Sequence, residues 1–224
     1  MTIQSLSLIH RLQMPAAAPD DHNTRHPALL ALHGRGSDEA DLLGLAPYLD
    51  DRLLWLSARA PLTLEGGFEW YRPPMSGAPT AEHFADSLAA LESFVAEIAE
   101  AYPIDAQRLY VFGFSQGTFM AYALALTQPQ RVAGVIAHSG ALPLQTISAA
   151  RSVDPAALRG KPVLVLHGTQ DRTIPLARAH EAREYLTEAG AGLEYHEYPI
   201  AHHVSEATLS AMDTWLQLQL DQPR

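Results

Sequence analysis

A serine flanked by glycines, in the segment Gly113-Phe114-Ser115-Gln116-Gly117, is the side chain of this chain best placed to act as a nucleophile. The apolar run 109–112 precedes it and helix-forming residues follow it, so Ser115 falls at a turn from a strand to a helix. The glycines let the strand and the helix approach closely, and such a turn exposes a strained serine hydroxyl. A glycine-rich turn in which Ser115 only caps the helix is the alternative. The position between a strand and a helix favours the nucleophile.

An acidic residue is needed as well, because a serine hydroxyl is a weak nucleophile that depends on a base and on a group that orients the base. Asp171 follows the apolar run 163–166, so it would lie at the carboxyl end of a strand. Its alternative role is to cap a turn before Pro175. Asp154 is a rival acid, but it lies in a polar segment next to Pro155. The placement after a strand favours Asp171.

Four histidines follow that acid along the chain and are candidates for the base. His180 falls in a helical stretch and His196 in a strand-like one. His202 and His203 fall between the last expected strand and the last expected helix, where a loop can carry an imidazole to Ser115. Spacing alone does not separate these two neighbours. A metal site is the alternative for the pair, but neither a His-Glu-x-x-His spacing nor a cluster of carboxylates accompanies it, so we expect no metal.

Acyl transfer also needs two N–H donors directed at the oxyanion, and removing one such donor costs about 2.7–4 kcal/mol. We expect one donor to be the backbone amide of Gln116, the residue after Ser115. The other is expected from Arg35, in the segment 33–37 that follows the first buried strand. A turn with glycines at positive φ is the alternative for that segment. Neither glycine-rich segment has the spacing of a phosphate-binding loop.

The elements that must position these groups are short apolar strands that alternate with amphipathic helices. Strands are expected at 6–12, 28–32, 53–56, 109–112, 132–137, 163–166 and 193–198. Helices are expected at 81–101, 116–126, 177–189 and 206–220. This alternation predicts the α/β fold class: a mostly parallel, doubly wound central sheet with helices on both faces. Ligands of such sheets bind beyond the carboxyl ends of the strands.

One segment, residues 58–80, departs from this alternation. It holds four prolines and three glycines, so we expect no regular structure there. It also holds large apolar side chains, and long loops in compact domains are often functional. We therefore expect Trp70 and Tyr71 to bind substrate, near its acyl group. The alternative is a loop that packs its aromatic residues onto the core.

Length and composition exclude several classes of function. The chain has 224 residues, enough for one domain that spans 1–224. Its formal net charge of −10 disfavours nucleic acid and anionic membranes as partners. Cysteine is absent, which excludes disulfides, thiolate nucleophiles and cysteine-ligated metals. We find neither a basic leader nor the roughly 20 apolar residues that span a bilayer, so we expect a cytoplasmic location without membrane insertion.

Five segments occur in an order that resembles a known family. They are Leu32-His33-Gly34-Arg35-Gly36, Gly113-Phe114-Ser115-Gln116-Gly117, Ser139-Gly140-Ala141-Leu142-Pro143, His167-Gly168-Thr169-Gln170-Asp171 and Tyr198-Pro199-Ile200-Ala201-His202. Each is weak alone, but five at compatible spacing are strong. Together they resemble the phospholipase/carboxylesterase branch of the α/β hydrolases, which includes acyl-protein thioesterases and many small bacterial carboxylesterases.

The resemblance implies roles for individual residues. It makes Ser115 the nucleophile and Asp171 the acid, and it assigns the oxyanion amides to Arg35 and Gln116. The family's histidine usually follows a glycine in a Tyr-Pro-x-Gly-His pattern, which selects His202. This chain departs from the family at two positions, since Ala201 stands in place of that glycine and Thr118 in place of a glycine common after the nucleophile.

The resemblance also implies an α/β-hydrolase fold, and so small a chain leaves room for little or no lid. The expected activity is that of a serine carboxylesterase on short- to medium-chain esters, without cofactor. An acyl-thioesterase or a lysophospholipase is the near alternative, and a non-catalytic binding protein on the same fold is the alternative from another class. Dimers are common in the family, so a homodimer is one of the states to test.

Overall fold

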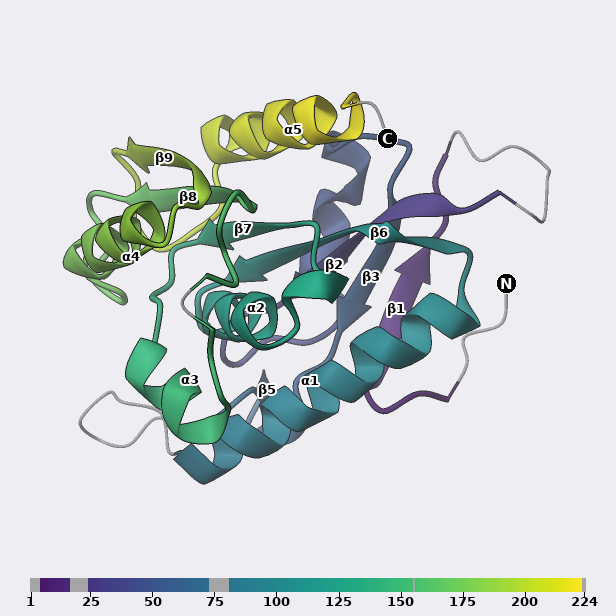
Figure 1. Ribbon diagram of the computed structural model, residues 1–224, viewed down its shortest axis with the longest axis horizontal. Helices are drawn as coiled ribbons and strands as arrows, with labels where there is room; N and C mark the ends of the chain where they lie inside the picture. The colour runs from purple at the N-terminus through teal and green to yellow at the C-terminus, as the bar shows by residue number, and fades with distance from the viewer. Residues whose placement is uncertain (1–4, 17–23, 73–80, 155, 223–224) are drawn as a thin grey trace.

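The central element is a twisted sheet in the order β1-β3-β2-β6-β7-β8-β9 (Figure 1). The structure is a computed structural model that describes residues 5–16, 24–72, 81–154 and 156–222. Neighbouring strands pair in parallel, except that β1 runs antiparallel to β3. The strands are β1 (His10–Gln13), β2 (His26–Leu32), β3 (Leu54–Ala58), β6 (Ile104–Phe114), β7 (Gly134–His138), β8 (Pro162–Gly168) and β9 (Gly192–Tyr198).

Helices cover both faces of this sheet, as Figure 1 shows. One face packs against α1 (Ala81–Ala101), α2 (Gln116–Thr127), α3 (Leu144–Ala150) and α4 (Ala177–Glu188). The opposite face packs against the short 3-10 helix η1 (Leu42–Tyr48) and against α5 (Glu206–Leu220). A second 3-10 turn, η2 (Pro129–Arg131), follows α2. The predicted fold class is confirmed.

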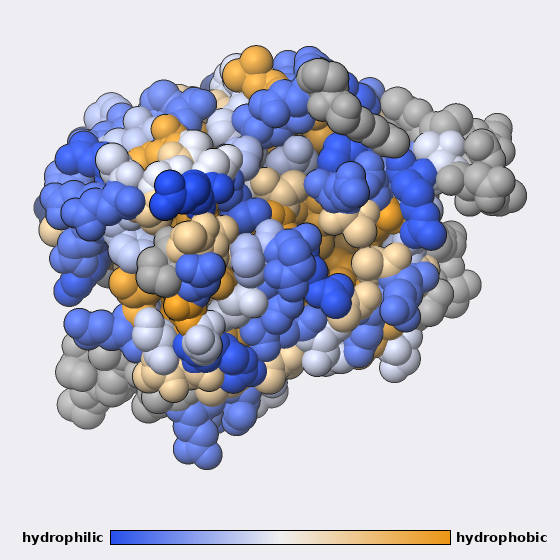
Figure 2. Space-filling model, viewed as in Figure 1, coloured by the Kyte–Doolittle hydropathy of each residue, from blue (hydrophilic) through white to orange (hydrophobic). Residues whose placement is uncertain are grey.

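Alternation along single strands explains the two apolar layers. In β8, Val163 and Val165 point into the layer that holds α1 and α2, whereas Leu164 and Leu166 point into the layer that holds α5. Side chains of a strand alternate between faces, and here both faces are buried, which accounts for runs of consecutive apolar residues. Polar residues cover most of the surface seen in Figure 2, and apolar residues show through only in places.

The regular elements agree with the sequence pattern, with some differences in length. Helices α1 and α5 have the expected bounds, and α2 and α4 differ from expectation by one residue at their ends. Strand β6 extends back to Ile104, and β1 begins only at His10, so Leu6 and Leu8 precede it. The short helices η1, η2 and α3 were not predicted.

The segment 58–80 is where the sequence-based expectation is wrong. It contains an antiparallel hairpin, β4 (Leu62–Leu64) with β5 (Gly67–Glu69), in which Leu64 pairs with Gly67. The two-residue connection places Gly66 at φ 83°, a conformation that glycine adopts without strain and that hairpin turns use. Residues 73–80 of the segment lie outside the described residues.

None of the helices in the described residues combines the length and the apolar composition that a membrane span requires.

Candidate active site

Ser115 stands at the sharp turn between β6 and α2. Its backbone has φ 53° and ψ −117°, a combination that is strained for a residue with a side chain. The N–H of Ser115 donates to the carbonyl oxygen of His138, at 3.0 Å, which ties the turn to the end of β7. The first residue of α2 is Gln116, so the helix N-terminus begins directly beside the serine and favours negative charge there.

The two flanking glycines are needed for close backbone contacts. A Cβ atom on Gly113 would lie 2.5 Å from the carbonyl oxygen of Gly117. A Cβ atom on Gly117 would lie only 1.9 Å from the carbonyl oxygen of Leu32, at the end of β2. Both positions therefore exclude a side chain, because α2 starts in van der Waals contact with the strands beneath it.

His202 lies between Ser115 and Asp171. Its Nε2 is 2.8 Å from Oγ of Ser115, and its Nδ1 is 2.7 Å from Oδ2 of Asp171. The other carboxylate oxygen of Asp171 accepts from the backbone N–H groups of Thr173 and Ile174, both at 2.9 Å. These bonds fix the carboxylate, which in turn fixes the orientation of the imidazole. The structure thus brings together three side chains that are far apart in the sequence.

The other histidines of the C-terminal third lie elsewhere. His203 is exposed, and its N–H donates to the carbonyl oxygen of Ala201. His180 contacts Glu197 and His196 contacts Glu194, at 2.8 and 2.7 Å. Spacing left His202 and His203 open, and the geometry distinguishes them. Among the residues described, three or more His, Cys, Asp or Glu side chains do not gather anywhere into a group able to hold a metal ion.

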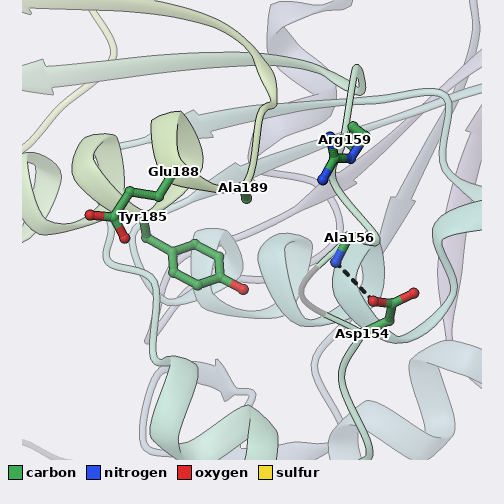
Figure 3. Close-up of a pocket in the computed structure, with 6 residues that line it drawn as sticks. All are labelled: Asp154, Ala156, Arg159, Tyr185, Glu188 and Ala189. Carbon is green, nitrogen blue, oxygen red and sulfur yellow. Dashed lines mark hydrogen bonds between the residues drawn. The ribbon is translucent and has the colours of Figure 1, made fainter.

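The rival acid, Asp154, lies in a different place. It lines a surface pocket together with Arg159 and Tyr185 (Figure 3). The volume of this pocket is ≈ 400 Å³. Its Oδ1 accepts from the backbone N–H of Ala156 at 2.8 Å, so the side chain caps a turn.

The loop that carries Arg35 packs against the serine turn. A Cβ atom on Gly34 would lie 3.3 Å from Cβ of Ser115. Within the described residues, the backbone N–H groups of Arg35 and Gln116 have no acceptor. An amide in the first turn of a helix lacks a partner within the helix, which leaves the N–H of Gln116 available to an oxyanion.

The unexpected hairpin β4–β5 braces this loop. The N–H of Gly36 donates to the carbonyl oxygen of Phe68, and the N–H of Phe68 donates to that of Ser37, both at 2.8 Å. The guanidinium of Arg35 donates through Nε to Oε2 of Glu69 at 2.7 Å, and Glu69 is 2% exposed. Glu69 was not predicted from the sequence, since an ion pair across 34 positions leaves no local signal.

Trp70 and Tyr71 support Gln116 rather than an open cleft. The N–H of Trp70 donates to Oε1 of Gln116, whose Nε2 donates to the carbonyl oxygen of Tyr71, each at 2.7 Å. The indole N–H of Trp70 donates to the carbonyl oxygen of His33 at 3.0 Å. Trp70 has 0% of its surface exposed and Tyr71 has 4%. Both rings pack into the core, as the alternative for this segment expects, and a contact with an acyl group stays a prediction.

An aromatic stack lies behind the imidazole, and sequence analysis did not anticipate it. The ring of Phe114 is centred 5.0 Å from that of His202 and 5.5 Å from that of His138. His138 is fully buried, and burial, with the neighbouring His167 and His202 as lesser causes, lowers its pKa to about 3. A neutral imidazole therefore stands behind the site.

Thr118 stands where a glycine is common in the family, and its hydroxyl group makes hydrogen bonds to two backbone carbonyl groups. Its Oγ1 lies 2.7 Å from the carbonyl oxygen of Gly113 and 2.9 Å from that of His138. A Cβ atom on Gly140 would lie 2.2 Å from Cβ of Thr118, so the threonine occupies space that residue 140 leaves free.

A solvent-accessible hollow of ≈ 680 Å³ opens beside the imidazole and the carboxylate. Its lining consists of Thr169, Gln170, Asp171, Arg172, Thr173, Ala201 and His202. Two loops that follow β8 and β9 form it, at the carboxyl ends of those strands, which is where ligands of open α/β sheets bind.

The chain is similar to known hydrolases both in sequence and in structure. The model of a family described as phospholipase/carboxylesterase matches residues 17–220. Acyl-protein thioesterase 1 of Debaryomyces hansenii is 29% identical over 159 residues, which cover 67% of this chain and 68% of that protein. The chain is also similar to the crystal structure of the Bacillus cereus carboxylesterase, with a TM-score of 0.81, 25% identity and coverage of 95% of this chain and 94% of that one.

A plant relative matches over a shorter region. Carboxylesterase SOBER1 of Arabidopsis thaliana is 30% identical over 125 residues, which cover 55% of this chain and 53% of that protein. The chain spans about half the length of several plant relatives that it matches.

Proposed function

Since the chain belongs to the phospholipase/carboxylesterase family, we propose that it is a serine carboxylesterase that hydrolyses short- to medium-chain carboxylic esters through an acyl-enzyme. One observation carries this proposal: His202 lies within hydrogen-bonding distance of Ser115 on one side and of Asp171 on the other. A hydroxyl, an imidazole and a carboxylate in this order form the arrangement that activates a serine.

In the first half of the reaction, Oγ of Ser115 attacks the ester carbonyl while Nε2 of His202 takes the hydroxyl proton. The imidazolium that forms is stabilised by the carboxylate of Asp171, 2.7 Å from Nδ1. The carbonyl oxygen gains negative charge, and the backbone N–H groups of Arg35 and Gln116 donate to it.

The tetrahedral intermediate then collapses. The bond from the carbonyl carbon to the alcohol oxygen breaks, and His202 returns its proton to that oxygen, which leaves an acyl group on Ser115. A water molecule repeats the sequence: it gives a proton to His202, attacks the acyl carbon and releases the acid, and Ser115 regains its proton. No step requires a metal or an organic cofactor.

Short connections around the site support the proposed preference for short to medium acyl chains. The connections from β2 to η1, from β8 to α4 and from β9 to α5, residues 33–41, 169–176 and 199–205, are short, so these three offer little material for a lid. In this proposal the site opens to solvent beside the ≈ 680 Å³ hollow. An open site buries only a short stretch of acyl chain, so additional methylene groups add little to binding.

A fluorophosphonate probe tests the proposal, because it labels only an activated serine. Wild-type protein is expected to form one covalent adduct, at Ser115, and Ser115→Ala is expected to form none while it keeps its melting temperature. Ser210→Ala, an exposed serine on α5, is the matched control and should label like the wild type. A folded wild-type protein without an adduct at Ser115 would favour the non-catalytic binding protein.

Thioester hydrolysis is a second candidate, supported by the similarity to the acyl-protein thioesterase of Debaryomyces hansenii. Esters, thioesters and lysolipids share one tetrahedral intermediate, so the same groups serve all three. A panel of nitrophenyl, thioester and lysolipid substrates of equal acyl length, compared by kcat/KM, separates these activities.

A further inference from the structure

Two arginines share one buried carboxylate beside the loop that carries the first oxyanion amide. Nε of Arg35 lies 2.7 Å from Oε2 of Glu69, and Nε of Arg72 lies 3.5 Å from Oε1. The carboxylate side chain is 2% exposed, whereas the two arginine side chains are 49% and 60% exposed. These three side chains carry two formal positive charges and one negative charge, and the two positive groups are the exposed ones.

The ion pair orients Arg35 without using all of its donors. Within the described residues, Nη1 and Nη2 of Arg35 have no acceptor. A guanidinium held through Nε presents these two groups as a planar fork, and such a fork matches the two oxygens of a carboxylate. Glu69 therefore holds the guanidinium in place for a second, incoming carboxylate.

The fork belongs to the same residue as a proposed oxyanion donor. Because the backbone N–H of Arg35 is that donor, the guanidinium lies within one side-chain length of it. That length is below the Debye length of about 8 Å at physiological ionic strength, so salt does not fully screen the charge. On the other side, Glu69 precedes Trp70, which donates to the side chain of Gln116, the second oxyanion residue.

Charged residues around Arg35 limit the electrostatic attraction of a substrate carboxylate to short range. Glu39 is shared by Arg59 and Arg11, a second cluster with one net positive charge. The negative charges nearby on the same loops are those of Asp38, Asp41 and Glu65, and the whole chain has a net charge of −10. A long-range field thus does not favour anions, and a substrate anion gains only by direct contact with the fork.

Building on the proposed function, we propose that Arg35, with Arg72 beside it, binds a carboxylate on the acyl half of the substrate. The preferred esters are then half-esters of short dicarboxylic acids. His202 must protonate the alcohol oxygen, so the alcohol half lies toward the imidazole, whereas the fork lies on the oxyanion side.

Arg172 is the competing cation, because it lines the hollow beside His202 and Asp171. It is exposed, and among the residues described it has no partner that fixes its guanidinium. Arg172 would favour an ester whose anion is on the alcohol half, whereas Arg35 would favour one whose anion is on the acyl half. The two arginines are therefore distinguished by which half of the substrate must carry the charge.

Two matched pairs of esters test the proposal by acid release in a pH-stat. Monoethyl glutarate and ethyl pentanoate differ only by a carboxylate in place of the terminal methyl of the acyl chain. The acetate ester of 4-hydroxybutanoate and butyl acetate differ in the same way on the alcohol half. We expect kcat/KM to be about tenfold higher for the anionic member of the first pair, as for one charge-assisted hydrogen bond, and no such gain in the second pair.

Variants then locate the contact through the selectivity ratio, which is kcat/KM for monoethyl glutarate divided by that for ethyl pentanoate. Arg35→Gln should bring the ratio close to one, and Arg72→Gln should lower it by a smaller factor. Arg35→Lys keeps the charge, so its ratio should lie between those of Arg35→Gln and the wild type. Glu69→Gln keeps an oxygen that can accept from Nε of Arg35 but removes the negative charge that competes with the substrate carboxylate, so the ratio should rise. Arg52→Gln, a cation of similar exposure paired with Asp50 and Asp221, is the matched control.

A purely structural role for the ion pair would slow both esters equally and leave the ratio unchanged, which would overturn the proposal. So would an equal rate for both esters in the wild type, or a preference found only on the alcohol half and lost in Arg172→Gln. If instead the wild type hydrolyses neither ester and fluorophosphonate does not label Ser115, the proposed function itself fails. Labelling at Ser115 without selectivity rejects this inference alone.

Discussion

Each group around Ser115 has its own support at the residue scale. The carboxylate of Asp171 is held by two backbone N–H groups, and it orients His202. The two oxyanion residues are held from outside the site, Arg35 by Glu69 and Gln116 by the backbone of Trp70 and Tyr71. Positions so constrained need little rearrangement when charge develops, which is how a prepared site lowers a barrier.

The two neighbouring histidines should differ sharply in their effect on activity. His202→Ala removes the group between Ser115 and Asp171, so kcat should fall by several orders of magnitude. His203→Ala changes an exposed side chain and should keep kcat within about twofold of the wild type, since such substitutions rarely matter. Steady-state kinetics on one nitrophenyl ester measures both. Equal, modest losses would exclude His202 as the base.

The side chain of Gln116 provides a test of positioning. Gln116→Ala keeps the backbone N–H but leaves the N–H of Trp70 and the carbonyl of Tyr71 without their partner, at a cost of about 1–3 kcal/mol in the free energy of unfolding. The freed amide should also lower kcat, by less than the factor of about 10²–10³ for a lost donor. Gln130→Ala, at an exposed position, is the control. Wild-type kcat in a destabilised Gln116→Ala protein would contradict a positioning role.

At the scale of elements, backbone contacts decide what the turns tolerate. The start of α2 lies against the end of β2, and the hairpin β4–β5 lies against the loop after β2. In both places a glycine stands where a Cβ atom would overlap a carbonyl oxygen, at Gly117 beside Leu32 and at Gly67 beside Gly36. The site therefore depends on elements that approach more closely than side chains permit.

A pair of glycine substitutions tests this dependence. Gly117→Ala places a Cβ atom 1.9 Å from the carbonyl oxygen of Leu32, so we expect a loss above about 4 kcal/mol or an unfolded protein. Gly44→Ala is the control, because a Cβ atom at that position would have nothing within 4 Å, and it should change stability by no more than about 1 kcal/mol. Urea unfolding followed by circular dichroism compares them. Similar midpoints for the two variants would show that α2 can shift away from β2.

Much of this arrangement follows from sequence pattern, and the remainder has identifiable reasons. The apolar spacing in α1 is a strong periodic signal, and the consecutive apolar residues of β8 are the pattern of a strand that is buried on both faces. Hairpin β4–β5 was missed because Pro61 and Gly66 suggest a loop, although Gly66 supplies the turn. Helix α3 has seven residues, too few for a clear period. Spacing could not choose His202 over His203, because that choice depends on how one loop crosses the sheet edge.

The molecule as a whole encloses several histidines in its apolar layers. Burial lowers the pKa of His138 to about 3 and also lowers the pKa of His33. These groups bind protons more weakly in the folded chain than in the unfolded chain, so acid favours unfolding. Their contribution to stability is complete above pH 6.5, the reference value, and declines as the pH falls toward the folded pKa.

This coupling predicts a specific pH dependence. Between pH 6.5 and 5, His138 should lower the free energy of unfolding by up to about 1.4 kcal/mol per pH unit. His138→Gln should reduce that slope, and His203→Gln should not. The pKa of Glu39 is lowered from its reference value of 4.5, so its effect on stability is lost only below about pH 4.5 and does not enter the range from pH 6.5 to 5. Urea titrations at pH 7, 6 and 5 give the slopes, and identical slopes for His138→Gln and wild type would contradict the assignment.

The threonine at position 118 has a consequence for the evolution and redesign of this protein. Because its methyl and hydroxyl groups occupy the space a side chain at position 140 would need, the two sites are linked although 22 positions separate them. Any enlargement at position 140 should be tolerated only after position 118 has first become small. Mutational routes that enlarge position 140 are therefore ordered: the change at position 118 must come first, and the reverse order is blocked.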